Sequence, residues 1–398
     1  MSYAIGAPVL WPIPPDWSQP VRESLAWLTD YMQARDGTRQ KRQMRIAPRR
    51  AFVFQATADA DDRRILDALR FDQGVRQWAL PIWPDVQLLA APLAAGATSI
   101  PCDTVGRDFI DGGQAVLWSA RNVWELVAVQ TVAANALTLT APTVGAWAAG
   151  TRLYPVRTAR LQGTPGETHF NDDLSRTQVQ LLIDEPCDWA STAPAATYRG
   201  APVLEWRFDE SDDPTSSYER MVQTVDEQTG PISYFDLPAL PFRVQSHRWT
   251  LFGRSERTAF RSLLYWLRGR MGTLWVPSYQ ADLQLASAVG ASDAFLTVMW
   301  CGYTVFGRTQ ANRRDIRIEL RDGTVFYRRI TGSTEAGATE QITIDSALGM
   351  AVSAAAVRVI SFMTLAELAS DGIDLDHVHD VDGIAQCTTG WRGVKNDL

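Results

Sequence analysis

Cysteine and histidine, on which many metal and catalytic sites depend, are scarce in this chain. Its 398 residues include four cysteines and four histidines, and no Cys-x-x-Cys pair occurs. Thiols so far apart in sequence do not indicate a zinc site or a disulfide framework. We therefore expect Cys102, Cys187, Cys301 and Cys387 to be reduced and buried, in a protein that folds in the cytosol.

The sequence motifs of the common catalytic classes are absent as well. There is no Gly-x-Ser-x-Gly motif for a serine nucleophile, no phosphate-binding loop and no Gly-x-Gly-x-x-Gly dinucleotide motif. No run approaches the roughly 20 apolar residues that span a bilayer, and the first residues do not resemble a secretory signal. We expect no catalytic residue, no cofactor, no resident metal and no membrane insertion.

Two acidic clusters come nearest to a chemical site. In the first cluster, near the C-terminus, a His-x-His pair could place two metal ligands on one face of a strand, but the carboxylates around it lack the calcium-loop pattern. A second run of carboxylates could supply the acid pair of a glycoside hydrolase. We interpret the first cluster as a solvated terminal strand and the second as a solvated loop, with a metal site and a hydrolase as the alternatives. The clusters comprise Asp371, Asp374, Asp376, His377, His379, Asp380 and Asp382, and Asp209, Glu210, Asp212 and Asp213.

Charge and aromatic content favour protein contacts over nucleic-acid binding. The formal net charge is −7, whereas a phosphate-binding surface needs net positive faces. Lys41 and Lys395 are the only lysines, so nearly all cations are arginines, which suit interfaces through bidentate pairing and stacking on aromatic rings. The chain contains fifteen tryptophans, which is an unusually high number, and large aromatic residues dominate both cores and interfaces.

Short strings of residues recur, in the same order, along the two halves of the chain. Gly-Ala-Pro-Val-Leu occurs at residues 6–10 and again at residues 200–204. The nearly constant spacing of the later strings predicts a tandem duplication of a unit about the size of one domain. These later strings are the Trp–Pro–aromatic segments at 78–90 and 275–286, and the β-type segments at 137–139 and 342–344, and at 151–156 and 357–362.

The predicted fold is a β-rich α+β fold. We expect a tandem duplication of a β-sandwich or barrel unit that carries one amphipathic helix and a small all-β insertion. Short β-branched runs separated by Gly, Asn and Asp indicate the insertions. The expected boundaries are 1–160 for the first copy with its insertion at 91–150, 161–197 for a linking segment with one strand, 198–363 for the second copy with its insertion at 287–358, and 364–398 for a C-terminal tail with a terminal strand.

Apolar residues at helical spacing predict one helix in each unit, at 59–70 and at 255–268. Ser255 is the expected N-cap of the second helix. Glycines that tolerate a left-handed conformation are expected to end the helices, Gly74 the first and Gly269 or Gly272 the second. The Asp322-Gly323 pair predicts a hairpin turn over 321–324, because both residues accept a positive φ.

The tryptophans divide into recurring and non-recurring positions. Trp78, Trp83 and Trp275, together with Tyr279, recur between the units and are expected in the two cores. Five tryptophans that do not recur clearly are candidates for interfaces, because large aromatics that are not needed by a repeated core are free to contact neighbours. These interface candidates are Trp11, Trp17, Trp147, Trp189 and Trp300.

A family resemblance emerges from these patterns. The helix segment Asp62-Arg63-Arg64-Ile65-Leu66-Asp67-Ala68-Leu69 is followed by Trp-x-x-Pro-x-Trp, and then by an Ala-Gly-Ala-Thr-Ser-Ile strand and a Leu-Thr-Leu-Thr-Ala-Pro strand. With Ala-Gly-Thr-Arg-Leu-Tyr-Pro-Val at 149–156, they resemble the distal tail proteins at the tail tip of long flexible-tailed bacteriophages and related transposable phages. The resemblance covers most of residues 1–363 and rests on patterning, not on catalytic residues.

The resemblance implies a non-enzymatic structural role. Such proteins form a ring between the tail tube protein and the central hub protein of the baseplate, and they can carry tail fibres. Two copies per chain would let three chains form a pseudo-six-fold ring, with six chains as the alternative. The chain would be assembled in the host cytoplasm and would end in the virion. A receptor- or glycan-binding tail module, with tryptophans of the insertions stacking on sugars, is the alternative function, and a cell-wall or polysaccharide hydrolase is a further one.

Overall fold

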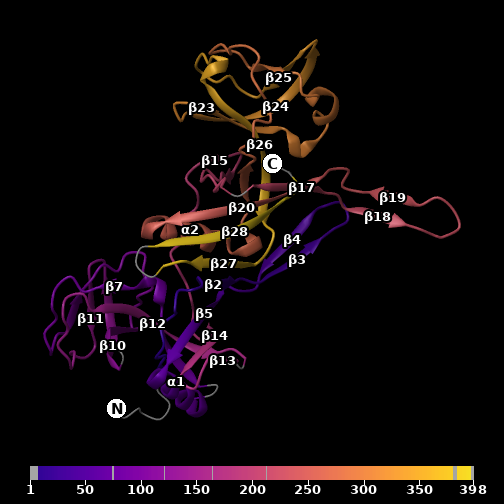
Figure 1. Ribbon diagram of the computed structural model, residues 1–398. Helices are drawn as coiled ribbons and strands as arrows, with labels where there is room; N and C mark the ends of the chain where they lie inside the picture. Colours follow the sequence, from indigo (N-terminus) through magenta and orange to yellow (C-terminus); the bar gives the residue numbers. More distant parts are fainter. Residues whose placement is uncertain are drawn as a thin grey trace.

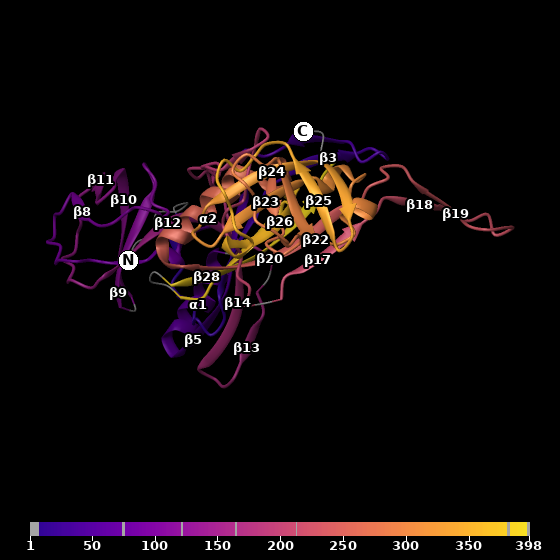
Figure 2. The same cartoon turned by 90° about the horizontal axis from the view of Figure 1, so that it is seen from above.

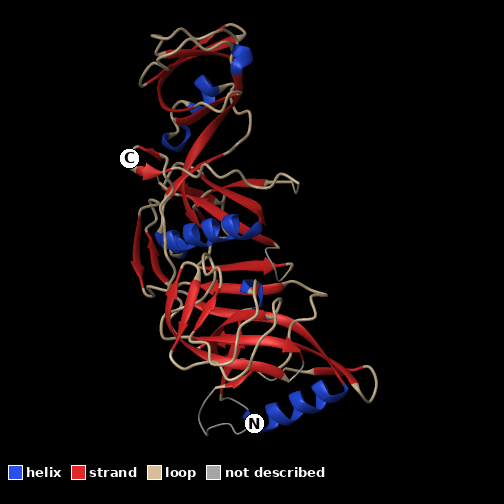
Figure 3. Cartoon of the chain, turned by 90° about the vertical axis from the view of Figure 1, so that its left-hand side faces the viewer, coloured by secondary structure: helices blue, strands red, loops and turns tan. Residues whose placement is uncertain are grey.

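The structure is a computed structural model that describes residues 8–395, apart from 74–75, 121, 164, 212 and 380–382. Strands make up 48% of the chain and helices 12%, with two main α-helices in the part described, so the expected β-rich α+β class is confirmed. The molecule is elongated, with the first half of the chain at one end and an all-β insertion of the second half at the other (Figure 1, Figure 3).

The first half is built around β5 (Arg49–Asp59), an eleven-residue strand whose inward side chains include Phe52, Phe54 and Ala56. On one side β5 pairs with β14 (Leu174–Ile183), and on the other with β2 (Val21–Ala26). Strand β14 also pairs with β13 and β12, and β12 pairs with β6. The remaining elements are β1 (Val9–Leu10), β3 (Thr29–Gln33), β4 (Arg39–Gln43), α1 (Ala60–Gln73), β6 (Gln77–Pro81), β12 (Arg152–Leu161) and β13 (Glu167–His169).

An all-β segment, which we call the first insertion, separates β6 from β12. Its strands pair in the order β8–β11–β10–β9, and β9 then pairs with β12. It has a hydrophobic cluster of its own, which includes Ile100, Leu117, Leu137 and Trp147. The strands are β7 (Gln87–Leu88), β8 (Ser99–Pro101), β9 (Gln114–Ala120), β10 (Val123–Ala133) and β11 (Ala136–Leu139).

The second half is built around β20 (Phe242–Phe252), an eleven-residue strand. Strand β20 pairs with β28 on one side and with β17 on the other. Strand β28 also pairs with β27 and β26, and β26 pairs with β21. The elements are β15 (Thr197–Tyr198), β16 (Ala201–Pro202), β17 (Thr215–Glu219), β18 (Val222–Val225), β19 (Ser233–Asp236), α2 (Gly253–Leu267), β21 (Leu274–Pro277), β26 (Val357–Leu368), β27 (Gly372–His377) and β28 (Ile384–Gly393).

The second insertion separates β21 from β26. Its strands pair in the order β22–β25–β24–β23, and β23 then pairs with β26. The predicted turn at 321–324 is confirmed: Gly323 has a φ of +89° and the Leu320 N–H donates to the Thr324 carbonyl. The strands are β22 (Phe295–Met299), β23 (Asp315–Leu320), β24 (Val325–Ala336) and β25 (Thr339–Ile344).

Both predicted helices are present, and α2 differs from its expected start. It begins at Gly253, with Phe252 in the N-cap position, so the prediction of Ser255 as N-cap is wrong. Gly253 has a φ of +71°, which lets the chain turn directly from β20 into the helix. The other end is as predicted: Arg268 and Gly269 both adopt the left-handed conformation. Gly74, the expected end of α1, lies outside the described residues.

Strand β2 joins the two halves into one continuous sheet. It lies between β5 of the first half and β27 of the second, and it pairs with β27 over six residues, from Val21 opposite His377 to Ala26 opposite Gly372. The sheet therefore runs β13–β14–β5–β2–β27–β28–β20–β17 across the molecule. The three strands at the joint lie side by side in Figure 1.

Two larger hydrophobic clusters lie on either side of this joint. The first includes Trp78 and Trp83, and the second includes Tyr279. Trp275 is fully buried in a smaller adjoining cluster. The prediction that these four aromatic residues belong to cores is therefore confirmed. Cys102, Cys187 and Cys387 are buried as expected, but Cys301 is exposed, so for that residue the prediction is wrong.

The two segments expected between and after the copies are part of the central sheet. Residues 161–197, expected to be a linking segment with one strand, contain β13 and β14, and β14 pairs along nine residues of β5. Residues 364–398, expected to be a tail, contain the end of β26 together with β27 and β28. In both segments, strands pair with partners that are distant in sequence, and the sequences of these strands do not indicate those partners.

Candidate functional site

A buried ionic cluster lies where the two halves meet. At its centre is Glu23 of β2, whose carboxylate has no exposed surface. Its Oε1 accepts a hydrogen bond from Arg50 Nε at 2.6 Å, and its Oε2 accepts one from Arg261 Nη2, also at 2.6 Å. His377 Nε2 lies 2.8 Å from the same Oε2. One carboxylate thus holds together β2, β5, α2 and β27.

The cluster extends into the first insertion through two buried aspartates. Asp108 accepts hydrogen bonds from both Arg50 and Arg157. Asp85 pairs with Arg254 of α2 at 2.5 Å, and it also accepts the backbone N–H of Asp108 at 3.1 Å. With Arg257, which donates to the Pro84 carbonyl at 3.0 Å, α2 directs a row of arginines at the first half. Their spacing of three to four residues is the sequence signal for this contact, and our sequence analysis missed it.

The electrostatics of the cluster keep Glu23 charged and His377 neutral. Burial opposes ionisation of Glu23, but attraction to Arg261 and Arg50 outweighs it and holds the pKa of this carboxyl well below its usual range. Burial lowers the pKa of His377 to about 4, so its ring is neutral at pH 7 and donates through Nε2. The cavity beside Asp85 and Arg257 has a volume of about 10 Å³, which leaves no room for a substrate. This arrangement serves to join the halves.

The acidic cluster around His377 has the same joining role. Asp374 accepts a hydrogen bond from the Ser24 hydroxyl, and Asp376 pairs with Arg22 at 2.9 Å, so both bind β27 to β2. Asp371 accepts the backbone N–H groups of Thr29 and Arg270. His379 is exposed, while Asp380 and Asp382 lie outside the described residues. No group of three metal-ligating side chains comes together in the part of the chain described.

Two described carboxylates of the second acidic run, Asp209 and Glu210, contact other side chains. Asp209 accepts a hydrogen bond from the Thr250 hydroxyl at 2.5 Å, which with further bonds from Ser211 lowers its pKa. Glu210 lies 3.6 Å from Arg207. Asp212 is outside the described residues. The raised pKa that a glycosidase acid needs is therefore not found at Asp209.

The five tryptophans expected at interfaces occupy different surroundings. Trp11 has no exposed surface and contacts Phe54 and Trp78 edge-to-face. Trp147 is buried in the first insertion, with its Nε1 donating to Glu125 at 3.0 Å. Trp17 and Trp189 are half-buried against the two cores. Trp300 is 51% exposed and stands at the edge of the second insertion, the position among the five that is most open to a neighbour.

Two hairpins, β3–β4 and β18–β19, have different surroundings. The β3–β4 hairpin of the first half lies against the second half: Lys41 Nζ donates to the carbonyls of Arg270 and Met271 at 2.9 Å and pairs with Glu367 at 3.0 Å. The β18–β19 hairpin, which we call the arm (residues 222–236), extends away from the body (Figure 1, Figure 2). Large apolar side chains are exposed along it and just after it: Val222, Val225, Ile232, Tyr234, Phe235 and Leu237.

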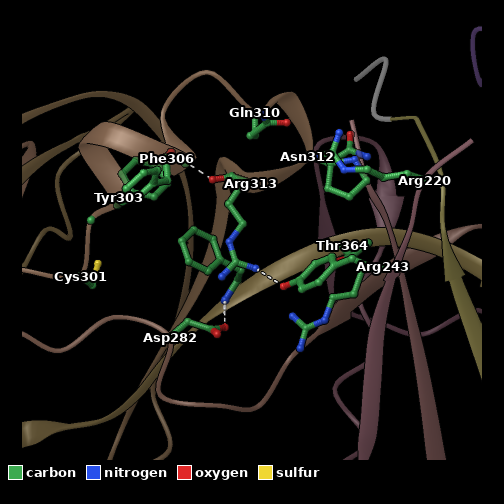
Figure 4. A pocket seen from close by; sticks show the side chains of 15 residues that line it. Arg220, Arg243, Asp282, Cys301, Tyr303, Phe306, Gln310, Asn312, Arg313 and Thr364 are labelled. Carbon is green, nitrogen blue, oxygen red and sulfur yellow. Dashed lines mark hydrogen bonds between the residues drawn. The ribbon is translucent and has the colours of Figure 1, made fainter. Parts of the chain in front are cut away.

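A cationic cleft opens at the base of the arm. It has a volume of about 520 Å³ and lies between β17, β20 and the second insertion. Arg220, Arg243 and Arg313 line it together with Asp282, and aromatic side chains form its walls (Figure 4). These residues follow no local pattern in the sequence and are separated by up to about a hundred positions, so no sequence signal identifies the cleft.

Comparison with known proteins gives no further assignment. No model of a protein family matches this chain, and no curated protein matches it. None of the helices in the described part of the chain is both long and apolar enough to cross a membrane.

Proposed function

We propose that this chain is a structural, non-enzymatic component of a bacteriophage tail tip that assembles head to tail into a ring. In this proposal the ring joins the tail tube protein to the central hub protein and can carry tail fibres. The chain consists of two copies of one scaffold, so three chains give a pseudo-six-fold ring, with six chains as the alternative. The phage assignment rests on the sequence resemblance, and the ring rests on the sheet edges described next.

The order of strand pairing supports the duplication. The first half pairs as β13–β14–β5–β2 and the second as β27–β28–β20–β17. A strand, a helix and an insertion follow β5 and β20 alike. The insertions pair as β8–β11–β10–β9–β12 and β22–β25–β24–β23–β26. Two unrelated domains have no physical reason to share this order of pairing.

The proposal of a ring rests on one observation. The first half binds the second half through a strand edge and a hairpin, and the corresponding strand edge and hairpin of the second half have no such partner among the described residues. In the chain, β2 pairs with β27. Their counterparts are β17 and β13, and among the described residues β17 pairs only with β20 and β13 only with β14. The β3–β4 hairpin lies on the second half, whereas its counterpart, the arm, projects with apolar side chains exposed. An open strand edge and an exposed apolar surface both call for a partner.

A second copy of the chain supplies that partner. Pairing β17 of one chain with β13 of the next repeats the β2–β27 joint between chains, and it brings the arm onto the first half of the neighbour. Such a contact is heterologous, so it generates a closed ring when the rotation between units permits closure. Edge pairing together with a buried arm is a contact of the kind expected to bury on the order of 1,000 Å² or more.

The register of this pairing follows from the joint inside the chain. Arg22 of β2 lies opposite Asp376 of β27. Thr215 is the counterpart of Arg22. Thr215 pairs with Ser246 of β20 and Arg22 pairs with Val53 of β5, and Ser246 and Val53 stand the same number of residues before the helix that follows each strand. By the same reasoning, Thr168 of β13 is the counterpart of Asp376. Thr215 of one chain should therefore lie opposite Thr168 of the next.

Disulfide cross-linking tests this register. In a Cys301→Ser background, which removes the exposed thiol, the Thr168→Cys/Thr215→Cys variant should form covalently linked chains under mild oxidation, seen as a ladder on a denaturing gel. The Thr168→Cys/Ser216→Cys variant is the matched control, because a shift of one residue places the second thiol on the other face of the sheet. Equal cross-linking of both variants, or of neither, would contradict the proposed register.

Native mass spectrometry of the purified chain tests the ring itself. Three chains per particle would support the pseudo-six-fold arrangement, six would favour the alternative, and a monomer at micromolar concentration would overturn the ring. Tyr234→Ser/Phe235→Ser in the arm should weaken assembly at least tenfold, because two exposed aromatic side chains lose their burial at the contact. Val144→Ser, an exposed apolar residue of the first insertion, is the control and should assemble like the parent.

A further inference from the structure

The cationic cleft at the base of the arm contains an arginine without an ionic partner. Arg243 of β20 is only 9% exposed, and its Nε and Nη1 atoms are buried without a hydrogen-bond acceptor. No carboxylate of the described residues lies within ion-pair distance of it. Burying a guanidinium that is not paired is costly, and an anion in the cleft would offset that cost. Arg220, by contrast, is already paired with Asp236 at 2.6 Å.

A single carboxylate, Asp282, faces the same cleft with one oxygen available. Both of its hydrogen bonds, from the Phe362 N–H at 2.8 Å and from the Ser278 hydroxyl, end on Oδ2. Oδ1 has no partner among the described residues and can accept a hydrogen bond. The cleft thus offers a cation for an anionic group and, beside it, an acceptor for a hydroxyl donor (Figure 4).

Aromatic side chains form the walls of the cleft, and they are held in place. Tyr303 and the 74%-exposed Phe306 come from a single-turn π-helix, Tyr303–Gly307. The Glu340 carboxylate accepts the backbone N–H groups of Tyr303 and Thr304 at 3.2 and 2.7 Å, which fixes this turn. Arg313 stacks over Phe362, with its guanidinium carbon 4.1 Å from the ring centre. Rigid apolar walls with few convergent polar groups are typical of sites for small ligands.

We propose that this cleft binds an acidic sugar residue, with the sugar carboxylate on Arg243, a sugar hydroxyl on Asp282 and the sugar ring against Phe306. A carboxylate forms charge-assisted hydrogen bonds with a guanidinium group. A doubly charged phosphate is disfavoured because Asp282 would repel it more strongly. An acidic peptide side chain has no hydroxyl to donate to Asp282. The cleft adjoins β17, one of the strand edges of the proposed ring, but Arg243, Asp282 and Phe306 lie outside that strand. It gives the particle a means of contacting an acidic polysaccharide.

Isothermal titration calorimetry on the full-length chain tests the proposal. The probes are a galacturonate trisaccharide, a neutral galactose trisaccharide, inorganic phosphate and triglutamate. The galacturonate trisaccharide should bind, and each of the other three should bind at least tenfold more weakly. Arg243→Gln should weaken galacturonate binding at least tenfold without lowering thermal stability, because it removes a buried charge that has no partner. Arg248→Gln is the matched control, since its side chain lies on the opposite face of the same strand.

Phe306→Ala provides an independent test of the proposal. This side chain is mostly exposed, so its loss should leave folding intact while it weakens galacturonate binding at least threefold. Several outcomes would overturn the proposal: no binding of the galacturonate trisaccharide, equal binding of the neutral sugar, of phosphate or of triglutamate, or unchanged affinity in Arg243→Gln. Arg243→Gln should keep the oligomeric state of the parent, so failure of this proposal is distinct from failure of the ring.

Discussion

Replacing Glu23 by glutamine should destabilise the joint between the halves more than any surface substitution would. The carboxylate is fully buried and accepts from Arg50 and Arg261, with His377 on the same oxygen. Glutamine has nearly the same shape, but it removes the negative charge and directs an NH2 group at one of these donors. Breaking a buried ionic contact by removing one partner costs about 3–5 kcal/mol.

That free energy converts into a measurable shift of the melting temperature. With an unfolding entropy of about 2.1 cal/mol/K per residue, a chain of 398 residues has roughly 0.8 kcal/mol/K in total, so a loss of 3–5 kcal/mol lowers the midpoint by about 4–6 °C when the chain unfolds as one unit. Differential scanning calorimetry measures this midpoint. Hydrogen exchange at the backbone amides of β2 and β27 should accelerate in the same variant, because the joint opens more often.

The control is Asp376→Asn, which removes one negative charge from the same joint. Asp376 pairs with Arg22, but their side chains are 33% and 53% exposed. An exposed pair of this kind is worth about 0–1 kcal/mol. If Glu23→Gln and Asp376→Asn lower the midpoint equally, burial of the cluster does not determine its strength and our reasoning is refuted.

Two further predictions concern pH and backbone packing. Burial lowers the pKa of His247 and of His377 from 6.5 to about 4, so the unfolded chain takes up protons before the folded chain does as the pH falls. The free energy of unfolding should therefore drop between pH 6.5 and pH 4, by up to about 1.4 kcal/mol per pH unit for each histidine. Above pH 6.5 these two histidines should not change the free energy of unfolding. Urea unfolding at pH 7 and pH 5 checks this, and a His247→Gln/His377→Gln variant with the same pH slope as the parent would contradict it. Gly272→Ala should cost about 1–3 kcal/mol, because the new Cβ would lie 2.7 Å from the Leu267 Cα atom and 2.9 Å from its carbonyl oxygen. Gly332→Ala, whose Cβ meets nothing closer than 3.7 Å, should be nearly neutral in the same urea titration, and equal losses in the two variants would count against a steric cause.

Local sequence patterns predicted the elements of this fold well. The apolar spacing in 255–268 predicted α2, and Asp322-Gly323 predicted the turn between β23 and β24. Each of these signals arises from residues within about a dozen positions, where the period of the side chains is set by the local backbone. The recurring Trp–Pro–aromatic segments likewise identified aromatic residues of the cores.

The candidate sites were not predictable in this way. The ionic cluster brings Glu23 together with Arg261 and His377, and the cleft brings Arg243 together with Asp282 and Arg313. Before the fold is known, a buried arginine and a solvated one look alike in sequence. The expectation of interface tryptophans shows the same limit: Trp11 and Trp147 proved to be buried within their own chain, and only the packing of the sheet faces decides this.

The sequence by itself therefore determined where both main helices and the turn between β23 and β24 form, because those choices depend on neighbours along the chain. Only the tertiary structure decided that β2 pairs with β27, that α2 directs its arginines at the first half, and that β13 and β17 each pair with a single strand within the described residues. The physical reason is that backbone hydrogen-bonding groups are the same in every strand. The choice of partner and register depends on how all the buried faces pack together at once.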